Sequence, residues 1–411
     1  MKIGIVGCGI GGMASAILLA ARGHQVTVLE RFARPRPLGA GLLLQPTGLS
    51  VLDRLGLGER ARTLGARVQG IKGLTAGGRS VLALDYAELG PGCSGFGIHR
   101  GVLFDLLYGA LEASAAQLVC EAEVVSLDSD PDRVTAIDAA GRRHGPFDLL
   151  LVCDGAHSSL RGRYAALRAD PSYPWGCVWA TLPDPERRFA GWLQQRFRST
   201  TVMAGVLPVG RDPAHPDAPS AVTLFWSLRG SAMEDWRRGD FAAWRAGLAA
   251  LWPELAPLLE RLSDPDDFTQ ARYRDVALRR WRQGRVLFLG DACHGTSPQL
   301  GQGANLALLD AWTLARALER AAPDALEVAL DAVERSRRRQ VDFYRQASRW
   351  LTPFYQSRLA PLGWLRDLTF GPACRFGPTR RFMLTTLAGL RRSWFASRPF
   401  DAGQGFDPDA D

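Results

Sequence analysis

The sequence has no apolar run that approaches the roughly 18 residues needed to span a bilayer. Its amino terminus, MKIGIVG, shows no basic region, long apolar segment or cleavage site of a signal peptide. The 7 cysteines are odd in number and show no C-x-x-C spacing, so neither a disulfide framework nor a zinc site is expected. The 6 histidines show no metal-ligand spacing, and a G-x-S-x-G elbow is missing. We therefore expect a cytoplasmic protein that binds no metal.

Lysine is almost missing from the sequence, so arginine carries nearly all of the positive charge. The formal net charge is +8, from 50 basic and 42 acidic side chains. Such a balance favours contact with an anionic substrate, a pyridine dinucleotide or an acidic membrane face. The arginines are dispersed in short groups, which argues against nucleic acid as a partner. With 411 residues, 46% of them hydrophobic, the chain suits two globular domains or one domain with an insertion.

A strand, a glycine turn and a helix open the chain. Lys2 to Val6 is strand-like, the helix runs from Met13 to Arg22, and a second strand, Gln25 to Leu29, ends in Glu30. Between the first strand and the helix, Gly7, Gly9 and Gly12 form G-x-G-x-x-G. In this setting the first glycine makes the turn, the second admits a pyrophosphate, the third lets helix and strand pack, and the acid takes ribose hydroxyls. The unit predicts dinucleotide binding.

Asp154 and Gly155 follow another apolar strand, Asp148 to Cys153. This turn is expected to join the first glycine turn at the edge of the sheet. Ser158 suits a helix cap, and Arg161 offers its charge to a phosphate. Further back in the chain, Gly41 is either loop punctuation or a place where backbone lies against a cofactor ring.

The stretch from Gly284 to Asp310 combines a strand (285–289), an acid at its end (Asp291), a loop with Pro298, Gly301 and Gly303, and a helix from Asn305. The carboxylate accepts hydrogen bonds from hydroxyls, and glycines let the backbone approach a flat ligand. The helix N-terminus favours developing negative charge. These features predict a site for a polyol attached to an electron-accepting ring.

The middle of the chain changes character at Tyr173, after which aromatic, partly alternating strands predict an antiparallel sheet. A helix is expected over 233–262, and helix from Asn305 to about Trp350. The tail, 352–394, is aromatic and basic. It either covers the active-site side or forms an interfacial amphipathic segment, and packing is favoured because prolines and glycines interrupt any long apolar face. Residues 399–411 are expected to be a disordered end.

Together these patterns predict an α/β protein: a Rossmann-type dinucleotide-binding domain, an antiparallel β-sheet substrate domain that interrupts it, and a C-terminal helical segment. The predicted boundaries are 1–172 and 274–350 for the first domain, 173–273 for the second and 351–411 for the C-terminal segment.

Three motifs in order carry a family resemblance: G-x-G-x-x-G from Gly7, D-G-x-x-S-x-x-R from Asp154, and G-D-A-x-H-x-x-x-P-x-x-G-Q-G-x-N from Gly290. The chain resembles the single-component FAD-dependent aromatic hydroxylases, the p-hydroxybenzoate hydroxylase-like flavoprotein monooxygenases, from Met1 to about Trp350. One departure is Cys293, where alanine is commoner before the histidine.

The resemblance implies that FAD is the cofactor and NADPH or NADH a co-substrate. An electron-rich aromatic small molecule would be hydroxylated with O2 through a flavin hydroperoxide, by a monomer or a homodimer. Alternatives on the same scaffold are a ubiquinone-pathway hydroxylase, a halogenase and an isoprenoid reductase, and the lack of W-x-W-x-I-P disfavours halogenation.

The resemblance also assigns roles to residues. Glu30 would take the adenosine ribose, Val124 would lie at the adenine, Arg100 near the pyrophosphate and Asp291 on the ribityl chain. The implied FAD-binding set is Gly7, Gly9, Gly12, Glu30, Arg31, Gly41, Arg100, Val124, Asp154, Gly155, Asp291, Pro298, Gly301, Gly303, Ala304 and Asn305. No catalytic base follows from the sequence; His294, Tyr273 and Pro298, with His99, are weak catalytic candidates.

Overall fold

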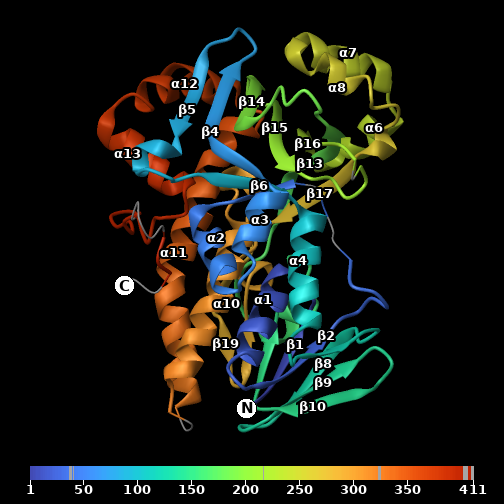
Figure 1. The fold of residues 1–411 in the computed structure, drawn as a ribbon, viewed down its shortest axis with the longest axis vertical. Coiled ribbons are helices and arrows are strands. Elements are labelled where there is room, and N and C mark those ends of the chain that lie inside the picture. Colours follow the sequence, from blue (N-terminus) through green and yellow to red (C-terminus); the bar gives the residue numbers. More distant parts are fainter. Residues whose placement is uncertain (37–38, 40, 216, 323–324, 401–405, 409–411) are drawn as a thin grey trace.

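The computed structural model describes residues 1–36, 39, 41–215, 217–322, 325–400 and 406–408, and two large sheets dominate it (Figure 1). The first sheet has six strands, of which only β19 runs antiparallel to its neighbour. Their order is β19 (Arg282–Gln283), β20 (Val286–Phe288), β11 (Leu149–Val152), β1 (Lys2–Val6), β2 (Gln25–Leu29) and β7 (Gln117–Val119).

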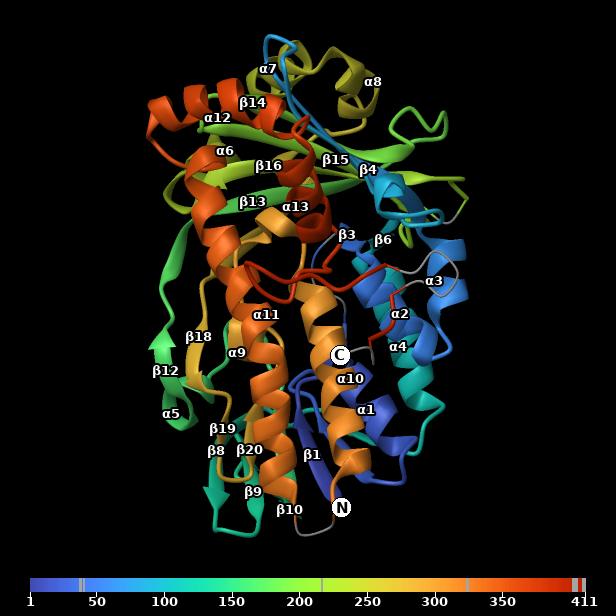
Figure 2. The ribbon, with the colours of Figure 1, turned by 90° about the vertical axis from the view of Figure 1, so that its left-hand side faces the viewer.

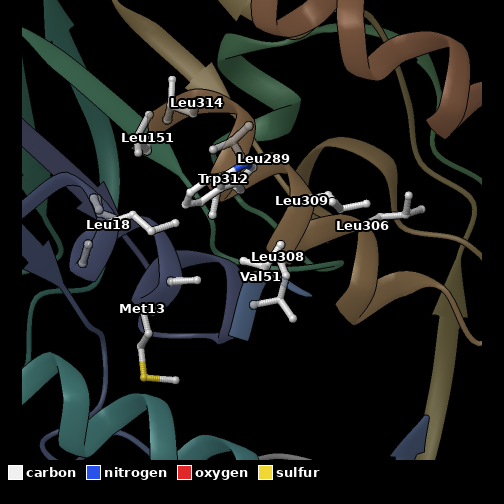
Figure 3. Packing of buried hydrophobic residues seen from close by; sticks show 14 of the residues in the cluster. Met13, Leu18, Val51, Leu151, Leu289, Leu306, Leu308, Leu309, Trp312 and Leu314 are labelled. Carbon is white, nitrogen blue, oxygen red and sulfur yellow. The ribbon is translucent and has the colours of Figure 1, made fainter. Parts of the chain in front are cut away.

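Both faces of this first sheet are covered, which is why its central strands are continuously apolar. The helices α1 (Ile10–Ala20) and α10 (Gly303–Arg320) pack together, and Figure 3 shows Leu18 and Trp312 from these helices close to Leu151 of β11. On the other side lies a small antiparallel sheet of β8 (Val124–Ser129), β9 (Val134–Asp138) and β10 (Arg143–Phe147). The covered strands form the main hydrophobic core.

The second sheet, called here the substrate sheet, has nine strands and is antiparallel except where β14 pairs with β4. Its order is β17 (Thr269–Arg274), β13 (Ser172–Pro183), β16 (Ala221–Arg229), β15 (Val202–Gly210), β14 (Gly191–Arg198), β4 (Ala66–Thr75), β6 (Gly95–His99) and β3 (Gly41–Leu44), with β5 (Ser80–Asp85) on β4.

This order corrects the predicted boundaries. Residues 1–172 were expected to belong to the cofactor domain, but β3, β4, β5 and β6 come from this segment and join the substrate sheet. The joining contact is the parallel pairing of β4 with β14, in which Ile71 lies opposite Leu193. Pairing between segments so far apart in the sequence leaves no local signal.

The helix expected over 233–262 is divided. The structure has α6 (Met233–Arg238), α7 (Phe241–Leu251) and α8 (Ala256–Leu259). Gly239 ends the first piece, and Asp240 caps the second, since its side chain accepts a hydrogen bond from the N–H of Ala243; Pro253 follows α7. These helices cover one face of the substrate sheet and form a separate core with it.

The long helix expected from Asn305 to about Trp350 is two helices, α10 and α11 (Leu326–Tyr355). Residues 323–324 between them lie outside the described part of the chain. The remaining helices are α2 (Pro46–Arg54), α3 (Gly58–Leu64), α4 (Arg100–Glu112), α5 (Arg161–Tyr164), α9 (Asp291–His294), α12 (Ala360–Ala373) and α13 (Gly377–Leu387). A two-stranded sheet joins β12 (Ala166–Ala169) to β18 (Ala277–Arg280).

The C-terminal tail packs on the molecule. Figure 2 shows α12 and α13 near the upper end of α11, beside the substrate sheet, and Cys374 and Leu384 join a third core with Val81. The expected disordered end falls mainly on 401–405 and 409–411, outside the described residues, but Phe406 is buried in the main core, so disorder is wrong for that residue. No described helix is both long and apolar enough to cross a membrane.

Candidate functional site

The glycine turn after β1 matches the geometry that its motif demands. A Cβ on Gly12 would lie 2.1 Å from the carbonyl oxygen of Gly7, so only glycine lets α1 approach the turn. Around Gly9, by contrast, a Cβ would meet no described atom within 4 Å. The turn is therefore packed tightly at Gly7 and Gly12 and open at Gly9, which is where the motif admits a pyrophosphate.

Glu30 fastens this turn to the end of β2. It is buried, and its carboxylate accepts hydrogen bonds from the N–H of Cys8 at 2.9 Å and from the N–H of Phe32 at 3.0 Å. Each carboxylate oxygen accepts more than one hydrogen bond, so the ribose role expected for Glu30 is compatible with this clamp. Arg31 beside it is exposed, with its guanidinium 4.6 Å from the ring centre of Phe32.

The carboxylate of Asp154 follows β11 and is largely out of water. Burial raises the pKa of Asp154, although Ser158 opposes the shift. Its Oδ1 atom is buried and has no hydrogen-bond partner among the described residues. A buried acceptor of this kind is costly unless a ligand satisfies it.

Arg161 does not have the predicted role. Its guanidinium is buried, lies 3.1 Å from Asp170 and donates to the carbonyl oxygen of Ala292 at 3.2 Å. These bonds tie the 154–161 turn to α9, so the arginine is used internally rather than offered to a phosphate. Ser158 does not occupy the predicted cap position, because the N-cap residue of α5 is Leu160, which makes no side-chain cap bond; Ser158 Oγ still accepts a hydrogen bond from the N–H of Arg161 at 3.1 Å.

Asp291 is the first residue of α9, directly after Gly290 with φ +58°. Its side chain is exposed, and its carboxylate accepts no hydrogen bond from the described residues. A Cβ on Gly303 would lie 3.7 Å from Asp291 Oδ1, so this carboxylate stands beside the N-terminus of α10. Ala304 follows in the same first helical turn, and Gly301, with φ +61°, ends the short 3-10 helix Pro298–Leu300.

His294 is a structural residue in this site. It is buried, and its Nε2 atom lies 2.5 Å from Oδ2 of Asp310, whose Oδ1 accepts from Arg337 Nε at 2.9 Å. Asp310 also accepts from the N–H of Gly290 at 3.2 Å. Burial raises the pKa of Asp310, but its interactions with His294 and Arg337 outweigh the burial and the net shift is downward. The network fixes the turn before Asp291, and His294 is too enclosed to serve as a base.

The side chain of Asn305 is likewise hydrogen-bonded within the protein. Its side chain accepts from the N–H of Gln45 at 2.9 Å and donates to the carbonyl oxygens of Leu43 at 3.1 Å and Gly301 at 3.0 Å. It thereby joins β3, the start of α2 and the loop before α10. Gln45 was not among the predicted site residues. Its Nε2 atom is buried and has no hydrogen-bond partner among the described residues.

Gly41 and Arg100 border the same region. A Cβ on Gly41 would lie 2.5 Å from Thr223 Oγ1, so this glycine lets β3 come close to β16 of the same sheet. Arg100 begins α4, and a Cβ on Gly39 would lie 3.2 Å from its Nη1 atom. His99 caps α4 by accepting from the N–H of Gly101 at 3.1 Å, and burial lowers its pKa. Val124 is buried at the start of β8.

One face of the substrate sheet is not covered by α6, α7 and α8. Alternation along β13, β16 and β17 places Cys177, Trp179, Phe225, Ser227 and Tyr273 on this face. The rings of Trp179 and Phe225 are 5.8 Å apart. The face is therefore aromatic with a few polar groups, as small-molecule sites are.

Polar atoms on this face lack partners. Gln356 donates to Ser227 Oγ at 2.8 Å, but its own Oε1 atom is buried and unsatisfied, as are Arg229 Nε and Tyr273 OH, among the described residues. Burial raises the pKa of Tyr273 well above its usual value, so its hydroxyl donates at neutral pH and Tyr273 is not a base. Neither Ser227 nor Gln356 was found from the sequence, because Ser227 lies on β16 and Gln356 at the end of α11, 129 residues apart in the chain.

Several of the predicted cofactor residues lie where the parallel strands end. The carboxyl ends of β1, β2, β11 and β20, with the residues that follow them, are called here the cofactor edge, and ligands of open α/β sheets bind at this edge. Gly9 is open, Glu30 keeps acceptor capacity, Asp154 has an unsatisfied oxygen, and Asp291 is exposed beside a long helix N-terminus. These residues fit a long ligand with a pyrophosphate, hydroxyls and an electron-accepting ring, as FAD has.

Comparison with known proteins gives the same answer. The profile of the family described as FAD binding domain matches residues 1–347. The chain is 30% identical over 362 residues to 3-amino-4-hydroxybenzoate 2-monooxygenase of Streptomyces cremeus, covering 86% of this chain and 88% of that protein. It is 27% identical over 340 residues to 6-hydroxynicotinate 3-monooxygenase of Bordetella bronchiseptica, covering 77% and 82%.

Solved structures share the fold. The crystal structure of Klebsiella pneumoniae HpxO complexed with FAD and uric acid superposes with a TM-score of 0.77 at 21% identity, covering 95% of this chain and 97% of that one.

Proposed function

This chain belongs to the FAD binding domain family and is an FAD-dependent aromatic monooxygenase, and from that premise we propose that it hydroxylates an electron-rich aromatic ring that carries an acceptor group, with NADPH or NADH as reductant. The observation that supports the proposal is that one molecule has both the cofactor edge and the aromatic face of the substrate sheet. The cofactor edge offers the groups that FAD requires, and the substrate sheet offers an aromatic face with unsatisfied donors.

The roles proposed at the cofactor edge follow from each group's free capacity. The open backbone at Gly9 would take the pyrophosphate, Glu30 the ribose hydroxyls, and Asp291 the ribityl hydroxyls. Asp154, with one unsatisfied buried oxygen, would accept a hydrogen bond from the same ligand or from the nicotinamide nucleotide. The N-terminus of α10 would stabilise negative charge on the ring system.

Bound FAD supplies the redox chemistry, which is acceptance of a hydride and delivery of one oxygen atom from O2 to the substrate. The chain's own contribution is binding, orientation and the exclusion of water. Tyr273, protonated at neutral pH, and Arg229 would donate hydrogen bonds to an oxygen of the substrate. Trp179 and Phe225 would hold its ring.

The substrates named for the relatives support this class. One relative acts on an aminohydroxybenzoate and another on a hydroxynicotinate, both of which pair an electron-donating group with a carboxylate. A ring of that kind is activated for oxygen transfer by its own substituents. This agrees with a site whose candidate bases, His99, His294 and Tyr273, are all engaged or protonated.

The compartment and assembly belong to the same proposal. Seven free thiols, several of them buried, suit the reducing cytoplasm. A monomer or homodimer is proposed, and light scattering on the purified protein measures which form is present.

The experiment is a screen of aromatic acids and hydroxylated heteroaromatics for stimulated NAD(P)H oxidation by the FAD-loaded protein. Product mass is then measured after turnover under oxygen-18 gas, with hydrogen peroxide counted separately. A hydroxylated product that carries one labelled oxygen is expected. Turnover that yields an unlabelled reduced or halogenated product would instead show a reductase or halogenase on this scaffold, and NAD(P)H oxidation that no aromatic stimulates would count against hydroxylation.

A further inference from the structure

The helix α12 presents its apolar side chains to the outside of the molecule. Trp364, Leu365 and Leu368 are 75%, 47% and 65% exposed, and Leu359 and Phe376 beside the two ends of the helix are exposed as well. The spacing of Trp364, Leu365 and Leu368 places these three side chains on one stripe of the helix. A contiguous exposed patch of this kind on a soluble fold marks an interaction site more often than chance exposure does.

The inner side of the same helix is fixed, so the outer side cannot turn inward. Gly363 lies against the backbone of Ser199, where a Cβ would be 3.3 Å from its Cα atom. The side chain of Arg366 is fully buried, lies 4.7 Å from the ring centre of Phe197 and donates to the carbonyl oxygen of Phe354 at 2.8 Å. The usual arrangement of a surface helix is thus reversed: the arginine is inside, and tryptophan and leucine are outside.

Positive charge surrounds this patch. Between 352 and 400 the sequence has a single acid, Asp367, and that acid pairs with Arg366 at 2.6 Å. The arginines of the segment are Arg358, Arg366, Arg375, Arg380, Arg381, Arg391, Arg392 and Arg398.

Three exposed arginines stand close to the helix. Arg358 precedes α12 and Arg375 follows it. Arg79 comes from the turn before β5, next to Ser80, whose carbonyl oxygen would lie 2.6 Å from a Cβ on Gly371 of α12. Within the described part of the chain, no carboxylate forms an ion pair with these three arginines.

We propose that α12 docks the protein on an anionic lipid surface, with Trp364 and Leu368 entering the interface and Arg358 and Arg375 facing lipid phosphates. Aromatic and aliphatic side chains flanked by arginine are the chemistry that such a surface recognises. A second copy of the chain is a poorer occupant. A symmetric contact through α12 would bring the arginines of one copy against those of the other, at a cost in like-charge repulsion.

The test is co-sedimentation of the FAD-loaded full chain with vesicles of phosphatidylcholine, with and without about 30% phosphatidylglycerol. Three variants are compared: Trp364→Ser with Leu368→Ser, Arg358→Gln with Arg375→Gln, and the control Val328→Ser. Val328 is 66% exposed on α11 and lies outside the patch, so the control removes an equally exposed apolar side chain. The flavin spectrum and thermal unfolding of each variant report an intact fold.

Binding to the anionic vesicles is expected for the wild type and the Val328 variant. Both double variants should bind the anionic vesicles at least about tenfold more weakly than the wild type. High salt should also weaken vesicle binding by the wild type. Failure of the wild type to bind either vesicle would overturn the proposal. Equal vesicle binding by all variants would also overturn it. So would self-association of a wild type that binds no vesicles, if the Trp364 and Leu368 changes abolish that self-association, because the patch would then belong to a contact with a second copy.

Discussion

The cofactor edge and the substrate sheet acquire their ligand-facing groups in different ways. At the cofactor edge, Gly9, Glu30, Asp154 and Asp291 each stand within a few residues of the end of their own strand. On the substrate sheet, Trp179 meets Phe225 and Thr269 only through strand pairing across long stretches of chain. The cofactor edge is encoded by residues that are close in sequence, so motifs predict it. The substrate sheet depends on strand register, so its ligand-facing residues cannot be predicted before the strand pairing is known.

The largest expected effect comes from the network that supports the cofactor edge. Asp310→Asn leaves the guanidinium of Arg337 buried without a compensating charge and removes the carboxylate that His294 contacts, and should lower the free energy of unfolding by about 3–5 kcal/mol. Chemical denaturation measures the loss. Glu319→Gln on the exposed side of the same helix is the control and should change little.

The same carboxylate gives a pH dependence. Its pKa is lowered from 3.8 in the folded protein, so its contribution to stability is present above that value and is lost as pH falls through the lowered pKa. The Asn variant should lack this acid-side loss. Equal stability of Asp310→Asn and the wild type at neutral pH would show that the network is dispensable.

Gly12→Ala should destabilise the protein by about 3 kcal/mol and reduce FAD retention, because its Cβ would lie 2.1 Å from a backbone oxygen. Gly109→Ala in α4 meets no described atom within 4 Å and should instead gain up to about 0.5 kcal/mol. Thermal unfolding of the apoprotein separates packing from cofactor binding. A Gly12→Ala protein as stable as the wild type would contradict the packing argument.

Asp291→Ala should weaken FAD binding by about 1.5–3 kcal/mol while leaving the fold intact, since the carboxylate is exposed and a charged hydrogen-bonding partner is lost. Flavin fluorescence during titration gives the affinity. An unchanged affinity would remove Asp291 from the cofactor site, and an unfolded variant would show that the residue has a structural role.

Tyr273→Phe tests the substrate sheet separately from the cofactor edge. It removes a buried hydroxyl without a described partner, so stability should stay the same or rise by less than about 1 kcal/mol. FAD affinity should not change, whereas KM for the aromatic substrate should rise by about fivefold, equivalent to one hydrogen bond. If instead FAD affinity falls and KM stays constant, Tyr273 belongs to the cofactor side.

The sequence predicts four of the six strands of the first sheet, β1, β2, β11 and β20, and the turns that follow them at the cofactor edge, because these signals lie side by side in the chain. It identifies residue types but not their partners: Arg161, Asn305 and His294 look like ligand groups until Asp170, Gln45 and Asp310 are seen to occupy them. The FAD-dependent monooxygenase assignment is confirmed by the family match. The individual FAD contacts stay predictions that Asp291→Ala and its companions test.

Two errors have a different origin. The break in the predicted 233–262 helix had signals in Gly239 and Pro253, which the apolar stripe outweighed. The boundary at 172 had none, because the partner of β4 lies more than a hundred residues away.

The parallel pairing of β4 with β14 has a consequence for protein engineering. Residues 173–273 are not a portable module, since their sheet is completed by β3, β4, β5 and β6 from 41–99. A chimera that exchanges substrate preference with a relative must therefore carry two separate inserts. A single-insert chimera would pair the relative's β14 with this chain's own β4, so the side chains on the two strands would not match.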